Sequence, residues 1–388
     1  MKKQLTVALG LAVLATPAFA SKARLQALGE SVDGSFYVND LRNVFLNAAN
    51  VNNHKDTVTF EWGTTGSLLD GIGPTSSPRA EGGFFKSAGN INYGVYLGSE
   101  SNTSNYFRSE ADVQMEEENN IDVFVGGDAG VKWGANLTYS KSAEDETIDD
   151  ATQTALRTRL GVISGDVEAF ANISLSNKAE DANGDELKGK LGYQVGAIYN
   201  LDNNYRLFAE YRSNTAEVDH RTAANDGDLK ATQLQVGAGH TSKLNDKANL
   251  FTKVQYQMNK AENDTALKGD FSDPTCTLAT SVSCEEYSAS FIPVVVGLEY
   301  DAASWLVLRG SVAQTIWGTQ EDADDKKGFA ESTVVNAGAS LKFGDLVVDG
   351  VIGNSNAGAA ATANDTSAGA GNLRTDNLMS RVSMTYRF

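Results

Sequence analysis

The sequence predicts an all-β fold, namely a transmembrane, antiparallel, up-and-down β-barrel of about 16 strands. Three observations predict it. Apolar and polar residues alternate strictly over segments of about ten residues, which is the period of a strand with two different faces. The connections between these segments alternate between short turns and long polar loops. Aromatic residues gather at both ends of one face of the segments, and no helical period is found between Asp56 and Phe388.

The alternation is clearest in VKWGANLTYS, which starts at Val131. Trp133 and Leu137 fall on one face and Lys132 and Asn136 on the other. The pattern returns in LGYQVGAIY, YRLFAEYR, LFTKVQYQM and the terminal RVSMTYRF. The predicted strands start near Thr57, Arg79, Ile91, Asn120, Val131, Thr152, Asp166, Leu187, Asn204, Asp228, Lys247, Tyr287, Ser304, Ser332, Leu346 and Asn377.

The connections predict which end of the barrel is which. Short turns rich in Gly, Asn and Asp lie at 88–90, 127–130, 164–165, 201–203, 244–246, 301–303 and 344–345. Long polar loops lie near 64–77, 100–118, 142–150, 177–186, 214–227, 260–286, 318–330 and 355–375. Membrane barrels of bacteria have short periplasmic turns and long extracellular loops. The chain is therefore expected in the bacterial outer membrane, and the even number of strands places both chain ends on the periplasmic side.

Aromatic placement separates a membrane barrel from a soluble sandwich, because the two share the alternation. The outer face carries aromatic residues beside the short turns and again beside the long loops, with small aliphatic residues between them. They are Tyr93, Trp133, Tyr199, Tyr205, Tyr300, Trp305 and Phe343 at one end and Trp62, Tyr139, Tyr211 and Tyr256 at the other. Two such belts match the two interfaces of a bilayer.

The N-terminal part divides into two predicted segments before the barrel. Residues 1–20 read as a signal peptide, with two lysines, a short apolar run and Ala18-Phe19-Ala20 as the cleavage site. Residues 21–55 contain two candidate amphipathic helices, at 22–28 and 39–49. This segment is either a plug inside the barrel or a periplasmic cap, and the sequence leaves both open. Residues 56–388 form the predicted barrel.

Composition excludes several functions. The chain carries 32 Lys and Arg against 50 Asp and Glu, a net charge of −18, so nucleic acid is not an expected partner. Cys276 and Cys284 are the only cysteines, and we expect one disulfide between them in an oxidising compartment. The three histidines, His54, His220 and His240, lie in no recognisable motif with Ser and carboxylate partners. We predict no enzyme, no metal site and no cofactor.

The terminal octet carries a family resemblance. A last strand that ends on Phe388, with Tyr386 two residues before it, together with the leader and the alternating strands, resembles the outer-membrane porin superfamily. The start SKARLQALGES followed by YVNDLRNVFLNAANV is similar to the short amphipathic leader of a class of outer-membrane proteins, among them the major porin-like protein of predatory Gram-negative bacteria. The resemblance implies that the last strand, with Tyr386 and Phe388, is the recognition tag for the barrel-assembly machinery, and it implies a homotrimer.

The inner face predicts what the barrel carries. The predicted lumen is basic although the chain is acidic, with pore-lining candidates Lys132, Arg157, Arg159, Lys188, Lys190, Arg206, Arg212, Lys253, Arg309 and Arg381. By resemblance, such a basic wall faces acids on an inward-folded loop, for which the candidates are Glu144, Asp145, Glu146, Asp149 and Asp150. The loop from Ser101 to Asn120, the 260–286 loop and the N-terminal segment are the alternative constrictions. A wide polar channel of this kind predicts a porin for ions and small polar solutes.

Two other functions remain open at this stage. One is a transporter of hydrophobic substrates that resembles the fatty-acid channel family, which a plug would favour. Against it, the predicted lumen holds few aromatic residues, chiefly Tyr96, Phe124, Phe170, Phe208 and Phe251. The other is a structural or adhesive barrel, in which side chains would block the lumen. In each case outer-membrane lipid and lipopolysaccharide are expected partners, the latter through divalent cations on the acidic loops.

Overall fold

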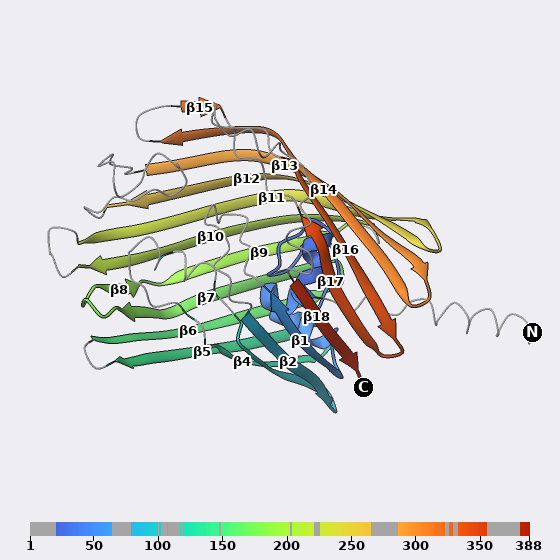
Figure 1. The fold of residues 1–388 in the computed structure, drawn as a ribbon, viewed down its shortest axis with the longest axis horizontal. Helices are drawn as coiled ribbons and strands as arrows, with labels where there is room; N and C mark the ends of the chain where they lie inside the picture. Colours follow the sequence, from blue (N-terminus) through green and yellow to red (C-terminus); the bar gives the residue numbers. More distant parts are fainter. Residues whose placement is uncertain are drawn as a thin grey trace, which may run out of the picture.

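The structure is a computed structural model that describes residues 21–63, 79–99, 101, 107, 117, 119–146, 149–201, 204–220, 226–264, 286–322, 326–328, 333–354 and 381–388. The described strands form one antiparallel sheet that closes on itself (Figure 1). Element labels follow Figure 1. The strands are β1 Thr57–Gly63, β2 Arg79–Ala88, β3 Ile91–Leu97, β4 Ile121–Asp128, β5 Lys132–Glu146, β6 Asp149–Ser164, β7 Val167–Glu180, β8 Glu186–Gly189, β9 Gly192–Asn200, β10 Tyr205–Asp219, β11 Gly227–Asn245, β12 Ala248–Asn263, β13 Glu286–Ala303, β14 Leu306–Asp322, β15 Lys326–Gly328, β16 Thr333–Phe343, β17 Leu346–Asn354 and β18 Arg381–Arg387.

The sheet closes into a barrel of 16 strand positions. The short elements β8 and β9 both pair with β7 and with β10, so they are two parts of one broken strand. In the same way β15 and β16 both pair with β14. The predicted fold class is therefore confirmed, and the strands start close to the predicted positions. The largest differences are β6, which begins at Asp149, and β18, whose first described residue is Arg381.

The seam of the barrel joins the two ends of the predicted barrel region. Strand β1 pairs with β18 from Thr57 opposite Arg387 to Gly63 opposite Arg381. Beyond it, the backbone N–H of Phe388 donates to the carbonyl of Asp56 at 3.0 Å. A lipid bilayer offers no partner for an open strand edge, so this pairing is what lets the chain span the membrane. Phe388 itself is 54% exposed on the outer surface, as the alternation predicts.

The hairpin of β5 and β6 corrects one expectation. The segment 142–150 is one of the candidates for a constriction loop, but its described part continues the two strands, with Glu144 opposite Ala151 and Asp145 opposite Asp150. An antiparallel pair satisfies its backbone groups beyond the membrane as well as within it, so the strands need not end where the apolar alternation ends. The five acidic candidates, Glu144, Asp145, Glu146, Asp149 and Asp150, are thus strand residues whose backbone does not fold across the lumen.

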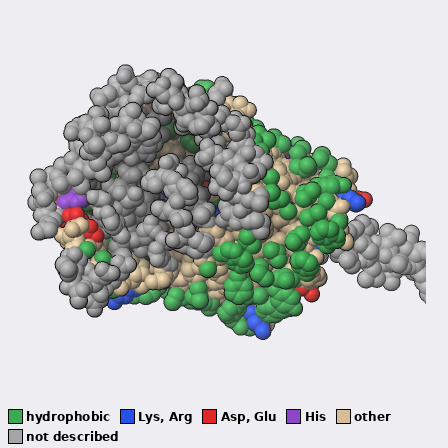
Figure 2. Space-filling view, in the orientation of Figure 1, with side chains coloured by type: hydrophobic (Ala, Val, Ile, Leu, Met, Phe, Trp, Pro, Cys, Tyr) green, Lys and Arg blue, Asp and Glu red, His purple; other side chains and the backbone are tan. Residues whose placement is uncertain are grey.

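The outer surface is apolar in the way that a bilayer requires. Each aromatic residue assigned above to the two belts is exposed, from 36% for Tyr211 to 59% for Phe343. Large aliphatic side chains such as Val123, Leu137 and Val236 are also exposed between the belts. Figure 2 shows hydrophobic side chains gathered on the barrel surface toward the short-turn end. Such an extensive exposed apolar surface marks contact with lipid. No helix in the described ranges is both long and apolar enough to cross a membrane.

The N-terminal segment lies inside the ring of strands. It contains helix α2 (Lys22–Ala27), one turn of helix α3 (Asn43–Leu46) and the 3-10 helix η1 (Ala48–Asn52). In Figure 1 these blue elements lie within the barrel toward its short-turn end. Ser21 caps α2, since its hydroxyl accepts a hydrogen bond from the N–H of Arg24 at 3.0 Å. Almost all of the segment is buried.

Candidate functional site: the plug and the inner wall

Residues 21–54, called the plug below, contact the inner wall around the whole circumference. The contacts reach every one of the strand positions in the closed sheet. They involve Glu61 on β1, Glu81 on β2, Tyr96 on β3, Phe124 on β4, Gly134 on β5, Gly161 on β6, Phe170 on β7, Ile198 on β9, Phe208 on β10, Gly239 on β11, Phe251 on β12, Glu299 on β13, Ser311 on β14, Gly338 on β16 and Asp349 on β17, with α2 also against β18. The plug therefore touches the inner wall on all sides.

Aromatic residues of the wall form the apolar part of the plug seat. The ring of Phe36 stacks on Phe208 with 4.4 Å between centroids. The ring of Phe45 meets Tyr96 edge-on at 5.0 Å and Phe124 at 5.6 Å. The wall aromatics that sequence reasoning counted against a hydrophobic-substrate transporter are all inward and all buried here: Tyr96, Phe124, Phe170, Phe208 and Phe251. They bind the plug, so their small number does not bear on the substrate.

Glycines of the wall let the plug backbone approach the strands. A side chain at Gly134 would collide with the carbonyl of Ala48, and one at Gly161 would collide with the side-chain amide of Asn47. The same holds, less tightly in some cases, around the ring of inward glycines Gly126, Gly134, Gly161, Gly239, Gly297 and Gly338. Close backbone approach is a position where only glycine fits without displacement. The glycines therefore shape the wall to fit the plug.

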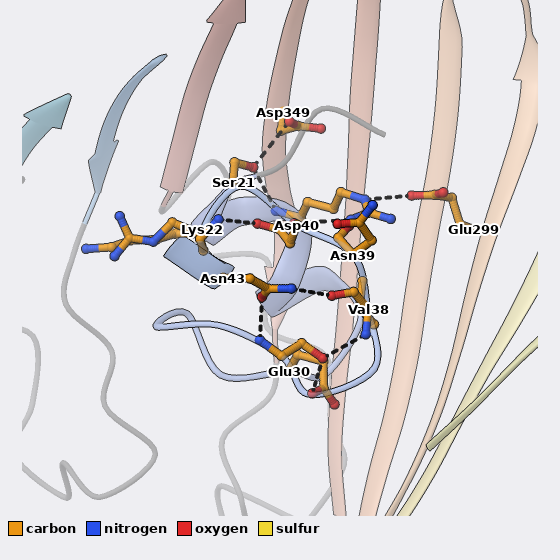
Figure 3. A network of polar contacts seen from close by, with 12 residues as sticks. Ser21, Lys22, Glu30, Val38, Asn39, Asp40, Asn43, Glu299 and Asp349 are labelled. Atoms are coloured by element: carbon orange, nitrogen blue, oxygen red, sulfur yellow. Dashed lines mark hydrogen bonds and ion pairs between the residues drawn. The ribbon is translucent and has the colours of Figure 1, made fainter. Parts of the chain in front are cut away.

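Buried ion pairs fix the plug to the wall on the β13–β17 side. The guanidinium of Arg24, 3% exposed, donates to Asp40 of the plug at 3.1 Å and to Glu299 of β13 at 3.0 Å (Figure 3). The hydroxyl of Ser21 donates to Asp349 of β17 at 3.2 Å. Arg309 lies between the two wall acids, 2.6 Å from Glu299 and 2.8 Å from Asp349. Each buried charge thus has a partner, which burial requires.

A second group of ion pairs holds the plug on β1, β2 and β12. Lys22 pairs with Glu81 at 2.7 Å, and its backbone N–H donates to Glu61 at 2.8 Å. Arg42 pairs with the same Glu81 at 3.1 Å. Across the barrel interior, Lys253 of β12 pairs with Glu30 of the plug at 2.7 Å. Removal of one partner from such a buried pair costs about 3–5 kcal/mol, so these pairs act as a lock once the plug is seated.

The wall above the plug, toward the long loops, has a charged part. Arg157 pairs with Glu117 at 2.6 Å, and Arg159 pairs with Asp122 at 2.9 Å. Both acids are fully buried. On β10, Arg212 lies 3.6 Å from Glu210. These three arginines are therefore held in ion pairs with acids of the wall or with Glu117.

The inner wall becomes apolar at the mouth, near the long-loop end. Ala179, Leu187, Ala216, Val218 and Leu229 of β7, β8, β10 and β11 form a cluster in which no residue is more than 3% exposed. Phe107 packs onto this cluster from the region between β3 and β4. We call these wall residues the mouth patch. They point into the barrel, where a water-filled channel would present polar side chains.

The predicted pore-lining residues divide between the two faces of the sheet. Eight of them point inward and meet the plug, the wall acids or the pocket below, namely Lys132, Arg157, Arg159, Arg206, Arg212, Lys253, Arg309 and Arg381. Lys188 and Lys190 do not line the pore. They lie on the outer face near the long-loop end and pair with Asp219 and Asp228, at 2.7 and 2.8 Å.

A bulge explains why Lys188 and Lys190 change face. Strand β10 pairs Ser213 with Tyr193 but Ala216 with Gly189, so the broken strand β8–β9 contains one extra residue at its break. One extra residue moves every following side chain to the other face. Leu187, opposite Val218, consequently points inward into the mouth patch.

A polar pocket lies between the plug and the wall near the short-turn end. It has a volume of about 330 Å³ and is lined by Ser35, Asn39, Asn43, Leu46, Asn47, Asn50, Asn53, Glu168, Ile198 and Arg206. The asparagines recur along the plug at intervals of three and four residues, so one side of the segment is a row of amides. This row is a sequence signal that the periodicity analysis overlooked because it tracked apolar residues alone.

The remaining candidates from the sequence do not assemble into a site. His54 is buried in the plug, His220 lies 3.3 Å from Asp185, and His240 stacks on Tyr205 at the short-turn end. The carboxylate of Asp181 accepts from the backbone N–H groups of Asn183 and Asp185, which makes a turn. Within the described ranges no group of three His, Cys, Asp or Glu residues is placed to hold a metal ion. Cys276 and Cys284 lie outside the described residues.

Comparison with solved structures finds matches at low similarity. The monoaromatic hydrocarbon channel CymD is 13% identical, with a TM-score of 0.40 over 96% of this chain and 98% of its own. The toluene transporter TbuX of Ralstonia pickettii is 14% identical, with a TM-score of 0.37 over 96% and 99%. A FadL homologue of Pseudomonas aeruginosa is 12% identical, with a TM-score of 0.43 over 95% and 98%. No protein-family model and no curated protein sequence matches the chain. At these scores the likeness carries no argument about function.

The class of protein follows from the geometry itself. The sheet is closed, its strands alternate lipid-facing and inward-facing side chains, and its outer surface is apolar between two aromatic belts. This is the architecture of a bacterial outer-membrane β-barrel. The protein is such a barrel, and residues 21–54 of the same chain occupy its lumen.

Proposed function

We propose that the protein is a gated outer-membrane transporter for small apolar molecules. The observation that carries the proposal is the mouth patch, an apolar inner surface in a barrel whose opposite end is filled by the plug. This is the hydrophobic-substrate alternative stated from the sequence, and it replaces the open, water-filled porin as the preferred function.

The plug argues against free diffusion of polar solutes. A porin needs an unobstructed, hydrated lumen, whereas this plug contacts the wall around its whole circumference and is locked by buried ion pairs such as Arg24 with Glu299. Solute transfer then requires the plug to shift. Coupling of that shift to binding of a solute at the mouth would make the barrel selective.

The mouth patch argues for an apolar solute. Burial of apolar surface contributes about 25 cal/mol per Å², so inward Leu and Val side chains near water need a cover. In the structure the benzyl side chain of Phe107, 3% exposed, is that cover. A solute with a ring or a short alkyl chain has the same shape and apolarity as the group that already fits. A purely structural barrel has no need for this apolar inner surface, on which Phe107 is the described loop side chain.

Passive diffusion of polar solutes is the second candidate, and the polar pocket favours it. With Glu168, Arg206 and a row of asparagines, the pocket offers water a place between the plug and the wall. If it connects through the barrel, small ions pass without plug movement. Stable conductance of the wild-type protein would support this candidate over the gated transporter.

Binding of an analogue of the Phe side chain tests the proposal. We suggest fluorine NMR of fluorotoluene with the refolded protein in lipid nanodiscs, and protein-free discs as the blank. We expect saturable binding that Leu229→Asn weakens about tenfold, since it removes about 1.5 kcal/mol of apolar burial. Leu244→Asn, at the exposed short-turn end of the same strand, is the matched control. Equal affinity of all three proteins, or no saturable binding, would reject the apolar-solute function.

A further inference from the structure

The inward side chains of β11 and β12 form three successive groups between the mouth and the plug, which differ in polarity. On β11 the inward residues are Leu229 and Ala231 at the mouth, then Gln233 and Gln235, then Gly239 against the plug. On β12, which pairs with it, Ala261 stands at the mouth and Phe251 at the plug. Between them lie Asn259, Gln257 and Gln255. The middle group is therefore a set of five neutral amides, called the amide track: Gln233, Gln235, Gln255, Gln257 and Asn259.

The amides of the track form one continuous hydrogen-bonded chain. Gln255 donates to Gln257 at 3.0 Å, and Gln257 donates to Asn259 at 3.1 Å. From the neighbouring strand, Gln233 donates to the same Asn259 oxygen at 3.0 Å, and Gln235 donates to Gln233 at 2.7 Å. These hydrogen bonds orient all five amides along the wall, from the mouth patch to the plug seat.

The five amides of the track use only part of their hydrogen-bonding capacity. A side-chain amide has two N–H donors and an oxygen that accepts twice. Gln255 is only 7% exposed, and its buried Oε1 has no partner among the described residues. Gln255 and Phe208 lie on the two strands that flank Gly237, each opposite this glycine, and Phe208 stacks on Phe36 of the plug. A buried acceptor without a donor is costly, so this oxygen suits an O–H or N–H group of a ligand.

The track is uncharged, in contrast to the rest of the middle wall. The basic residue below it, Lys253, is committed to Glu30 at 2.7 Å. On β6 and β10, by comparison, Arg157, Arg159 and Arg212 stand in ion pairs. A neutral wall with both donors and acceptors suits a hydroxyl or a carboxamide. A carboxylate would bring a charge without a counter-ion, because the cations within reach are already paired.

We infer that the amide track is a binding site for the uncharged, hydrogen-bonding group of the solute, and that the substrates are small neutral amphiphiles such as aromatic or aliphatic alcohols. The inference rests on the proposed function and narrows it. The apolar part of the solute lies on the mouth patch or displaces Phe107, and its hydroxyl group moves along the amides toward Gln255. There it reaches the plug seat, where a contact can favour release of the plug.

Three probes with the same ring test the inference: fluorotoluene, fluorobenzyl alcohol and fluorobenzoate, each measured by fluorine NMR with the full-length protein in nanodiscs. We expect the alcohol to bind about tenfold tighter than the other two after correction for partition into protein-free discs, since two neutral hydrogen bonds are worth roughly that factor. Gln255→Met keeps the length of the side chain and removes its amide. It should lower the affinity for the alcohol about fivefold and leave that for fluorotoluene unchanged. Gln314→Met, on the exposed outer face of β14, is the control and should change neither.

The outcomes separate the inference from the proposed function. Equal binding of the alcohol and fluorotoluene, or no effect of Gln255→Met on the alcohol, overturns the amide track as a ligand site while the apolar transporter stands. Tighter binding of fluorobenzoate than of the alcohol also overturns it. If neither the alcohol nor fluorotoluene binds in a saturable way that Leu229→Asn weakens, the proposed function fails, and the inference fails with it.

Discussion

The barrel has two apolar inner surfaces, and they differ in what covers them. The plug seat near the short-turn end is covered by a long segment of the chain itself, which adds stacked rings, close backbone contacts and ion pairs such as Arg24 with Glu299. Among the described residues, the side chain that covers the mouth patch near the long-loop end is Phe107. The inner surface of one barrel therefore serves two purposes. In the function that we propose, the surface that is also bound by buried charges is a structural closure, and the surface that Phe107 covers exchanges with a ligand.

The ion pairs of the plug seat should give the largest effect. Arg24→Met leaves Asp40 and Glu299 without one of their buried partners, which costs about 3–5 kcal/mol and shifts the plug toward an unseated state. We expect frequent, large conductance steps in planar bilayers where the wild type shows few. Lys243→Met is the control, because its pair with Asp246 is exposed and contributes little. A variant that conducts like the wild type would show that these pairs do not hold the plug.

Wall glycines should give the next largest effect. Gly134→Ala places a methyl group against the carbonyl of Ala48, and such overpacking costs about 1–3 kcal/mol. The plug should unseat about 30-fold more often, again read as conductance steps. Gly310→Ala is the matched control, because its added methyl group would lie 3.5 Å from the nearest atom, the carbonyl of Asn336. If the two alanine variants behave alike, the glycines do not shape the seat.

Removal of the side chain that covers the mouth patch should strengthen ligand binding. Phe107→Ala removes the side chain that competes with a ligand, so fluorotoluene should bind about fivefold tighter. Phe60→Ala, on the exposed outer face, controls for changes in the lipid contact. Binding is measured in nanodiscs as described above. Weaker binding to Phe107→Ala would mean that this ring forms part of the site instead of covering it.

The smallest expected effect is a change in ion selectivity. It is tested with one substitution on the inner face of the wall and one on the outer face. With the plug unseated by Gly134→Ala, Arg159→Gln should shift the reversal potential under a salt gradient toward cations, because it removes an inward positive charge beside Asp122. Lys188→Gln should leave that potential unchanged, because Lys188 lies on the outer face and pairs with Asp219. An equal shift for both would show that the bulge does not place Lys188 outside the pore.

The sequence predicts the barrel well because its signals are local. Alternation, turn residues and exposed aromatics act within one strand or one hairpin, so the strands, the aromatic belts and the seam at Phe388 could all be predicted. Where an inserted residue changes the face of a strand, alternation fails. Lys188 and Lys190 follow the alternation that runs through Tyr193, and only the pairing with β10 shows the extra residue at the break.

The site could be predicted only in part, because its contacts join segments far apart in the chain. A segment with amphipathic helices looks the same as a cap or as a plug until the wall that faces it is known. The wall residues that contact the plug can be recognised from the sequence as inward-facing, but their partners cannot. Examples are Phe208, which stacks on Phe36, and Gly134, which lies against Ala48. Neither period nor composition connects such pairs. The mouth patch depends on the same bulge that misled the placement of Lys188.

The conductance of the wild-type protein in planar lipid bilayers tests the central claim most directly. The claim is that residues 21–54 close the barrel. Folded wild-type protein should insert without stable, large conductance steps, and Arg24→Met should produce them at the same protein concentration. Stable, large steps from the wild type, unchanged in Arg24→Met, would contradict the claim and restore an open porin as the function.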